Sequence, residues 1–300
     1  MDRIYLPAIQ REGMTPKGKL IAIGGNENKG QPNGNGDIDQ EHFIEGGILR
    51  RFCDELKGDA SKIEVITSAS KYPEEVGRNY LEAFDKLGVS AVKVMHIDAR
   101  EKANNEEYLE RIREADGILI SGGDQLKLTS LLGGTELLNI LKDRYMEEEG
   151  FVLAGTSAGA MCMSNTMIYR GNSSAGLYKG EVKITTGLAF ITGVIIDSHF
   201  VKRGRFSRLT QTVAANPSII GIGLGEDTGI VISEGNSFET IGSGQVIIFD
   251  GHEIRHSNIA DIAMGEALSI ERMIVHIISK GNFFYLKERT FSEDKLLEFK

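Results

Sequence analysis

Residues 155–159, Gly-Thr-Ser-Ala-Gly, have the spacing of a nucleophile motif and directly follow the apolar run Phe151–Ala154. In the G-x-S-x-G pattern a serine stands at the tip of a sharp turn between a strand and a helix, where small flanking residues relieve close contacts. Ser157 Oγ would then stand clear above a sheet, and the backbone N–H of Ala158 would open a helix where it can stabilise an oxyanion. We therefore expect Ser157 to be a nucleophile; the alternative is a glycine-rich helix start without chemistry.

A serine hydroxyl needs a base, and the base needs a third group to orient it. Of the six histidines, His199 follows the apolar strand expected over Val194–Asp197, at the strand end where active sites of parallel sheets lie. We expect His199 to be the base, although a surface histidine would give the same pattern. The carboxylates of Glu226 and Asp227 follow another apolar run, and spacing does not choose between them as the orienting acid.

The stretch Ser121-Gly122-Gly123-Asp124-Gln125 closes a further apolar run. Because glycine has no Cβ, the backbone can approach a ligand closely here, so Gly123 can offer a second oxyanion N–H. An ordinary strand-to-helix turn with Asp124 as the N-cap is equally compatible with the pattern.

The overall composition is that of a globular protein and excludes several classes. The 300 residues are 41% hydrophobic and 26% charged, and the formal net charge of −9 gives no global basic footprint for nucleic acid. No apolar run approaches the ~20 residues of a membrane span, and the first residues lack the pattern of a signal peptide. Two cysteines are too few for a disulfide framework, and no metal-ligand motif is present, so we expect no cofactor.

Strand-like runs and helical periodicity alternate through the first half of the chain, which predicts an α/β fold with a mostly parallel central sheet and helices on both faces. The expected strands are Lys19–Gly25, Ile63–Ser68, Ala91–His96, Gly117–Ser121 and Phe151–Gly155. The expected helices are Glu41–Leu56, Glu74–Gly88, Asn105–Ala115, Leu126–Leu132, Glu136–Glu148 and one that begins at Ala158. The loops after the first, fourth and fifth strands should converge on one crevice.

The second half of the chain predicts a short antiparallel β extension. Strands are expected over Val194–Asp197, Ile220–Gly225, Ile230–Ser233, Phe238–Ile241 and Val246–Phe249, with a helix over Ser207–Ala215. Neither an internal repeat nor a linker interrupts the chain. We therefore expect a single α/β domain over residues 1–300, with residues 1–17 and 283–300 as peripheral segments.

Taken together, these residues resemble the cyanophycinases, serine peptidases of the peptidase E-like group within the class I glutamine amidotransferase-like fold. The resemblance runs from Ala22 to about Gly281. Its specific segments are Gly155–Ala160, Gly223–Thr228, and Asp197-Ser198-His199-Phe200 with the following Arg203, Arg205 and Arg208. The last segment distinguishes the cyanophycinases from the wider peptidase E-like group, since G-x-S-A-G alone indicates only that wider group.

The resemblance implies hydrolysis of cyanophycin, a poly-aspartate chain with arginine on each β-carboxyl, to β-Asp-Arg dipeptides through an acyl-enzyme. It implies Ser157 as the nucleophile, His199 as the base and Glu226 as the orienting acid, and with it we expect a cytoplasmic homodimer that binds neither nucleic acid nor membrane. The expected substrate-binding residues are Asp124, Gln125, Asp197, Ser198, Arg203, Arg205 and Arg208. Arginine suits this role because it holds carboxylates in bidentate pairs.

Three features depart from the pattern of that family. Asn26 stands where a small residue is expected, Ser198 stands where a glutamine is expected, and residues 33–39 form a local insertion. Because Ser198 is next to the expected catalytic histidine, its departure concerns substrate contacts more than catalysis.

Three other functions fit parts of the pattern. The first is a peptidase E-like aspartyl dipeptidase, an enzyme closely related to the class that we favour. An α/β-hydrolase esterase would order its triad Ser…Asp…His, as Asp227 and His252 allow, although no HGGG-type motif precedes the elbow. A non-catalytic module would keep the elbow as a small-ligand site.

Overall fold

The computed structural model of the chain describes residues 14–31, 42–58 and 60–295. The expected insertion at 33–39, the start of the helix expected from Glu41 and most of the N-terminal peripheral segment lie outside the described residues.

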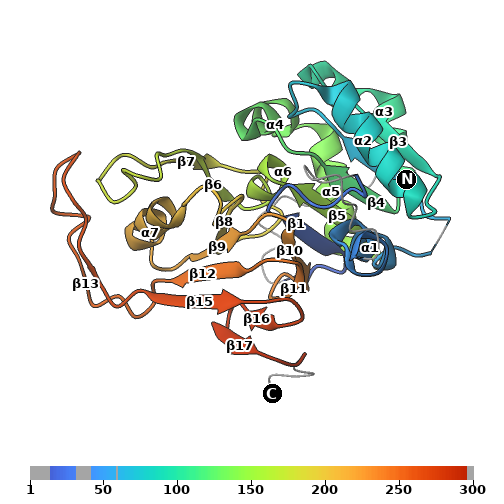
Figure 1. Cartoon of the computed structure of the whole chain (residues 1–300). Helices are drawn as coiled ribbons and strands as arrows, with labels where there is room; N and C mark the ends of the chain where they lie inside the picture. Colours follow the sequence, from blue (N-terminus) through green and yellow to red (C-terminus); the bar gives the residue numbers. More distant parts are fainter. Residues whose placement is uncertain (1–13, 32–41, 59, 296–300) are drawn as a thin grey trace.

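A nine-stranded mixed sheet forms the centre of the molecule, in the order β17-β16-β11-β10-β1-β5-β4-β2-β3 (Figure 1). Its parallel half consists of β1 (Lys19–Ile23), β2 (Ile63–Ile66), β3 (Val92–Met95), β4 (Gly117–Ile120) and β5 (Val152–Thr156). Each of these strands pairs in parallel with its neighbour in this half. All five expected strands are therefore present, and the loops at their carboxyl ends meet at one edge of the sheet.

Helices cover both faces of this half, as the alternating pattern predicts. They are α1 (Ile48–Asp54), α2 (Pro73–Lys86), α3 (Glu106–Glu114), α4 (Gln125–Leu132) and α5 (Glu136–Glu147). Leu20 of β1 packs in one core cluster with α3, α4 and α5, whereas its neighbour Ile21 packs with α1 and α2. Successive strand residues point to opposite faces, so each face needs its own helical layer. None of the helices in the described ranges is both long and apolar enough to span a bilayer.

The helix expected over Glu41–Leu56 is the main local difference. A π-helical turn over His42–Gly46 precedes Gly47, and the regular helix α1 starts only at Ile48. The Gly46–Gly47 pair explains the interruption, because glycine is a poor helix former that loses much conformational freedom in a helix.

Antiparallel strands continue the sheet beyond β1. These are β10 (Thr228–Ser233), β11 (Ser237–Gly242), β16 (Phe283–Tyr285) and β17 (Thr290–Ser292). β10 pairs directly with β1, so the antiparallel extension shares one sheet with the parallel strands. The C-terminal strands β16 and β17 form its far edge, and Phe284 of β16 is fully buried.

A second, four-stranded sheet lies beside the first, in the order β15-β12-β9-β8 (Figure 1). Its strands are β8 (Val194–Asp197), β9 (Ile220–Leu224), β12 (Val246–Asp250) and β15 (Ile274–Ile278). Helix α7 (Phe206–Ala215) packs on it through Leu209 and Val213. The strand expected over Val246–Phe249 therefore belongs to this second sheet and is separate from the extension made by β10 and β11.

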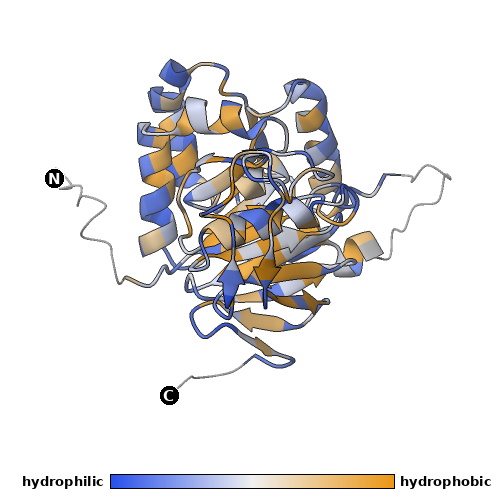
Figure 2. Cartoon of the chain, turned by 90° about the vertical axis from the view of Figure 1, so that its left-hand side faces the viewer, coloured by the Kyte–Doolittle hydropathy of each residue, from blue (hydrophilic) through white to orange (hydrophobic). Residues whose placement is uncertain are grey.

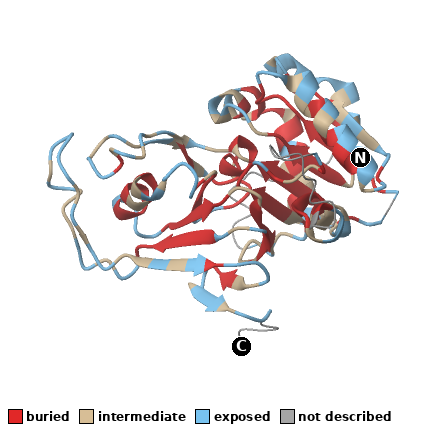
Figure 3. Cartoon of the chain, in the orientation of Figure 1, coloured by how far each residue is buried: buried red, intermediate tan, exposed pale blue. Residues whose placement is uncertain are grey.

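Smaller elements complete the fold. They are the four-residue helix α6 (Ala158–Met161), the 3₁₀ turn η3 (Arg100–Asn104), and the pairs β6 (Thr166–Arg170) with β7 (Lys183–Thr186) and β13 (His256–Ser257) with β14 (Ile270–Glu271). Apolar residues gather in the central strands and on the inner sides of the helices (Figure 2), and the strands at the centre of the molecule are buried (Figure 3). The rigid core thus lies directly beneath the loops at the carboxyl ends of the strands.

Candidate active site

The turn at Ser157, between β5 and α6, has the backbone geometry that the G-x-S-x-G pattern predicts. Ser157 has φ 52° and ψ −111°, a conformation that residues other than glycine rarely adopt. A Cβ at Gly155 would lie 2.6 Å from the carbonyl carbon of Gly159, and one at Gly159 would lie 2.3 Å from the carbonyl oxygen of Ile120. The turn closes only because both positions are glycine, as the spacing predicts.

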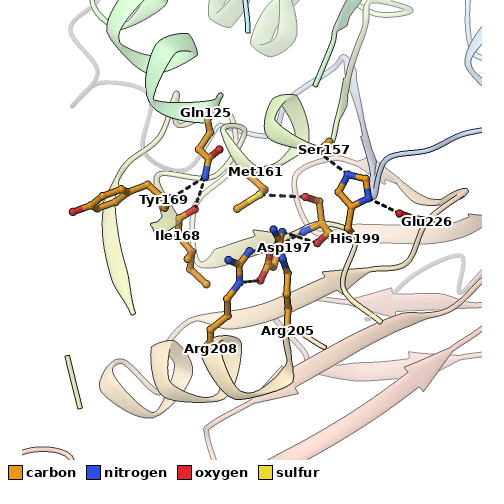
Figure 4. Close-up of polar contacts among 11 residues, drawn as sticks. Gln125, Ser157, Met161, Ile168, Tyr169, Asp197, His199, Arg205, Arg208 and Glu226 are labelled. Atoms are coloured by element: carbon orange, nitrogen blue, oxygen red, sulfur yellow. Dashed lines mark hydrogen bonds and ion pairs between the residues drawn. The ribbon is translucent and has the colours of Figure 1, made fainter. Parts of the chain in front are cut away.

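Ser157, His199 and Glu226 form a continuous chain of contacts (Figure 4). Ser157 Oγ lies 3.0 Å from His199 Nε2, and His199 Nδ1 lies 2.8 Å from Glu226 Oε1. With Nδ1 protonated and donating to Glu226, Nε2 is free to accept the serine proton. The three residues follow β5, β8 and β9, so Ser157 comes from the large sheet, whereas His199 and Glu226 come from the second sheet.

The surroundings of His199 favour its neutral form. Burial lowers the pKa of its imidazole, the neighbouring charges of Arg203 and Arg205 lower it further, and the contact with Glu226 only partly offsets them. Its backbone N–H donates to the carbonyl of Gly24 at 2.8 Å, and its φ of 46° lies in the left-handed region. A neutral imidazole is the form that can act as a general base.

Glu226 has two partners besides His199. Its Oε2 lies 3.1 Å from Lys202 Nζ and accepts a 3.3 Å hydrogen bond from Asn26 Nδ2. Burial alone would raise the pKa of Glu226, but hydrogen bonds from His199, Lys202 and Asn26 hold it below its ordinary value. The carboxylate is therefore ionised. Sequence reasoning did not find Lys202 or Asn26 as site residues, and the only signal was the unusual asparagine at position 26.

Asp227 faces away from the histidine. Its Oδ1 accepts from the backbone N–H of Asn28 at 2.9 Å, and its Oδ2 accepts from Ser243 Oγ at 2.7 Å. The geometry thus pairs His199 with Glu226 where the spacing left both acids open. His252 contacts Asp250 at 2.7 Å, so the Asp227–His252 arrangement of the esterase alternative is not assembled.

The loop after β4 passes directly beside the serine. A Cβ at Gly122 would stand 3.1 Å from Ser157 Cβ, and one at Gly123, where φ is +145°, would stand 2.1 Å from the carbonyl oxygen of Ala69. Position 123 therefore requires glycine, whereas a side chain at Gly122 would press on Ser157. The assignment of Gly123 and Ala158 as oxyanion donors stays a prediction.

The two polar residues after this loop have local partners. The carboxylate of Asp124 caps α4 by accepting from the backbone N–H groups of Leu126 at 2.8 Å and Lys127 at 3.1 Å. Gln125 Nε2 donates to the carbonyls of Ile168 at 3.3 Å and Tyr169 at 3.2 Å and so links α4 to β6 (Figure 4). The N-cap role that the pattern allowed for Asp124 is therefore present.

Asp197 is the centre of a buried ion cluster (Figure 4). Arg205 Nη1 donates to its Oδ1 at 2.9 Å and to the carbonyl of Ser198 at 2.8 Å, and Arg208 forms a two-pronged contact whose Nε–Oδ2 distance is 2.5 Å. Burial and the charges of neighbouring arginines lower the pKa of Arg205 to about 10. Two of the three expected substrate arginines are thus engaged by an internal carboxylate.

The remaining two expected substrate residues differ in accessibility. The hydroxyl of Ser198 is buried and donates to Met161 Sδ at 3.3 Å, whereas Arg203 is exposed. Across the described residues, no three His, Cys, Asp or Glu side chains gather as ligands of a metal ion. The arrangement as a whole is suited to nucleophilic catalysis at Ser157.

The fold has a counterpart among solved structures. Among solved structures, the fold is similar to that of a peptidase from an acI-B1 Actinobacterium, with a TM-score of 0.57, 24% identity, and coverage of 80% of this chain and 93% of that chain. The two chains thus share an α/β fold.

Sequence relatives are more specific. The family model of peptidase family S51 matches residues 34–240. A cyanophycinase of Synechococcus elongatus is 35% identical over 272 residues, which cover 90% of this chain and 80% of that protein. A cyanophycinase of Trichormus variabilis is 33% identical over 294 residues, which cover 96% of this chain and 94% of that protein. The chain therefore belongs to peptidase family S51 and is a serine-type peptidase.

Proposed function

We propose that this peptidase degrades cyanophycin and releases β-Asp-Arg dipeptides as an exopeptidase. The observation that carries the proposal is the contact chain Ser157–His199–Glu226, which supplies the nucleophile, base and orienting acid that peptide hydrolysis needs. The substrate is supported by the cyanophycinase relatives, which match nearly the whole chain.

The proposed reaction has two stages. Ser157 Oγ attacks the carbonyl carbon of the scissile backbone amide while His199 Nε2 takes the hydroxyl proton, and the N–H groups of Gly123 and Ala158 stabilise the oxyanion. The imidazolium then protonates the leaving amine, and the C–N bond breaks to leave an acyl-enzyme. Water, deprotonated by His199, attacks the ester, and collapse of the second tetrahedral intermediate returns the proton to Ser157. Glu226 stabilises the imidazolium in both stages.

Substrate recognition is proposed to divide between exposed and buried residues. In the proposal Arg203 holds a substrate carboxylate and Asp124 receives a guanidinium, and the exposure of both side chains supports these roles. The buried cluster around Asp197, with Arg205 and Arg208, supports this by fixing the segment that carries His199 and Arg203. In this proposal Gln125 and Ser198 shape the wall between them.

The test is incubation with purified cyanophycin and identification of the products by mass. We expect β-Asp-Arg from the wild type and none from Ser157→Ala. If α-linked aspartyl dipeptides are cleaved and the polymer is not, the aspartyl dipeptidase alternative holds. If neither substrate is cleaved, the proposed activity is wrong.

We also propose that the chain works as one α/β peptidase unit, as a homodimer in the cytoplasm. The dimer is supported by the edge strand β15, which exposes the apolar side chains of Val275 and Ile277. Light scattering on the purified protein tests it, and a particle of single-chain mass at micromolar concentration would contradict it.

A further inference from the structure

One short segment, residues 23–28, contacts every member of the proposed triad. Its contacts are the Ile23 carbonyl with the N–H of Ser157 at 2.9 Å, the Gly24 carbonyl with the N–H of His199 at 2.8 Å, and Asn26 Nδ2 with Glu226 Oε2 at 3.3 Å. These triad residues come from two different sheets. The segment that leaves β1 is therefore the part of the chain that relates the nucleophile to its partners.

A buried carboxylate anchors this segment. The side chain of Glu27 is 1% exposed and accepts hydrogen bonds from three donors. Thr156 Oγ1 donates to Glu27 Oε2 at 2.6 Å, the Tyr80 hydroxyl donates to Oε1, and Lys29 Nζ lies 2.8 Å from Oε1. The donor Thr156 is the residue immediately before Ser157.

The Glu27 carboxylate is ionised, and both of its oxygens accept hydrogen bonds. Burial by itself would raise the pKa of Glu27, but the charge of Lys29 and the three hydrogen bonds outweigh it and hold the pKa below its ordinary value. Burial and the nearby carboxylate raise the pKa of Tyr80, so its hydroxyl stays protonated and donates. A carboxylate is an acceptor on both oxygens, which is what the donors around it require.

Ser157 needs support of this kind. Its backbone lies in a strained region that persists only where the surrounding structure determines it. The hydrogen bond from Thr156 to Glu27 fixes the last residue of β5 against the segment that also touches His199 and Glu226. A shift of the elbow by as little as ~1 Å is enough to lower turnover markedly.

We propose that Glu27 is a positioning residue for the nucleophile: through Thr156 and the segment 23–28 it holds Ser157 in register with His199 and Glu226. The proposal rests on the proposed role of Ser157 as the nucleophile. Glu27 itself does not touch the reacting atoms. Its removal should therefore lower the rate at which Ser157 reacts and leave the binding of substrate unchanged.

The first experiment compares two identical substitutions of buried glutamates. Glu27→Gln places an amide N–H₂ against one of the donors around Glu27. The control, Glu64→Gln, makes the same change at a buried glutamate of β2, where the amide faces the guanidinium of Arg111 on α3. The readouts are the rate of fluorophosphonate labelling at Ser157, kcat and KM on cyanophycin, and Tm. Glu27→Gln should lower labelling and kcat together by ~10- to 100-fold, the cost of a misplaced reacting group, with little change in KM. Glu64→Gln should lower Tm while labelling stays close to that of the wild type.

The second experiment uses Thr156, in case Glu27→Gln does not fold. Thr156→Val keeps the shape of the side chain and removes the hydroxyl that donates to Glu27, whereas Thr156→Ser keeps the hydroxyl. We expect Thr156→Val to lower labelling by ~10-fold, in line with the loss of a charge-assisted hydrogen bond, and Thr156→Ser to restore most of it.

Three results would overturn the proposal. They are wild-type labelling rates in folded Glu27→Gln and Thr156→Val, an equal loss of labelling in Glu64→Gln, and no difference between Thr156→Val and Thr156→Ser. The proposed substrate is judged separately. If the wild type is labelled at Ser157 but does not degrade cyanophycin, the assignment of cyanophycin as the substrate is wrong. The labelling rates of the variants still decide the role of Glu27 in that case.

Discussion

Gly25 lies directly against the imidazole of His199. A Cβ at Gly25 would stand 2.5 Å from His199 Nε2 and 2.6 Å from Cε1, and Gly25 has φ +100°. Any side chain at this position would therefore occupy the space in which the ring contacts Ser157 Oγ. A glycine at position 25 is thus a condition for the contact between His199 and Ser157.

Gly25→Ala should abolish most activity without unfolding the protein. The added methyl group displaces the His199 ring, so we expect kcat to fall by ~100-fold or more. The matched control is Gly281→Ala, because Gly281 also has a positive φ, +84°, with nothing within 4 Å of an added Cβ. Both variants should lose about 1 kcal/mol of stability from backbone strain. Equal kcat values for the two variants would refute the steric argument.

Ser157→Ala should lower turnover by several orders of magnitude, by analogy with other serine triads. The change removes one hydroxyl oxygen from a partly exposed residue, so Tm should stay within a few degrees of the wild type. Product release from cyanophycin measures the first effect and thermal unfolding the second. A folded variant that keeps more than a few per cent of the activity would show that Ser157 is not the nucleophile.

Glu226→Gln should cost far more activity than Asp227→Asn. Glu226 contacts His199 Nδ1, whereas Asp227 holds the backbone of Asn28 and the hydroxyl of Ser243. Loss of the carboxylate at 226 removes the group that fixes the tautomer and stabilises the imidazolium. The measurement is kcat for both variants. A larger loss in Asp227→Asn would move the orienting role to that residue.

The pH profile should follow the lowered pKa of His199. Protonated His199 cannot accept the serine proton, so labelling at Ser157 falls as the pH falls through its pKa, below the ordinary value of 6.5. The charge of Arg203 helps to lower that pKa, so Arg203→Gln should raise it and move the acid limb to higher pH. Arg50→Gln, which removes an exposed charge on α1, is the control and should leave the limb in place. An acid limb that does not move in Arg203→Gln would contradict this account.

The arginines after His199 should separate into two groups. Lysine lacks the planar fork of arginine, so Arg203→Lys should lower cyanophycin hydrolysis by ~10-fold, the loss of one charge-assisted hydrogen bond, while fluorophosphonate labelling stays unchanged. Arg208→Lys disturbs the buried pair with Asp197, so Tm, labelling and hydrolysis should fall together. If Arg203→Lys keeps full hydrolysis, Arg203 does not hold the substrate.

The elbow could be predicted from the sequence because its requirements are local. An apolar run, two glycines and a serine between them specify strand, turn and helix, and the structure confirms β5, the turn and α6 in that order. The alternation of strands and helices likewise predicted the parallel half of the sheet. The helix after the elbow was expected to continue, but α6 ends at Met161.

The partners of the site residues could not be predicted because they depend on tertiary contacts. Glu226 and Asp227 are neighbours in the chain, and only the backbone turn at Asp227, where φ is 45°, sends their carboxylates to different partners. Arg208 is on a helix and Asp197 on a strand, so the buried pair between them follows from packing rather than from spacing. Asn26 contacts Glu226 for the same reason, since distant parts of the chain meet there.

The position of β1 has a consequence for how the chain is made. Leu20 of this first strand pairs with Leu153 of β5 on one side and with Ile232 of β10 on the other. Both neighbours are synthesised long after β1, so the backbone N–H and C=O groups along its two edges stay without their partners while most of the polypeptide leaves the ribosome. Such distant pairings close slowly and expose aggregation-prone strand edges in the meantime. A nascent chain that ended before Thr228 would lack β10 and leave one edge of β1 without its partner, so the central sheet is completed only late in translation.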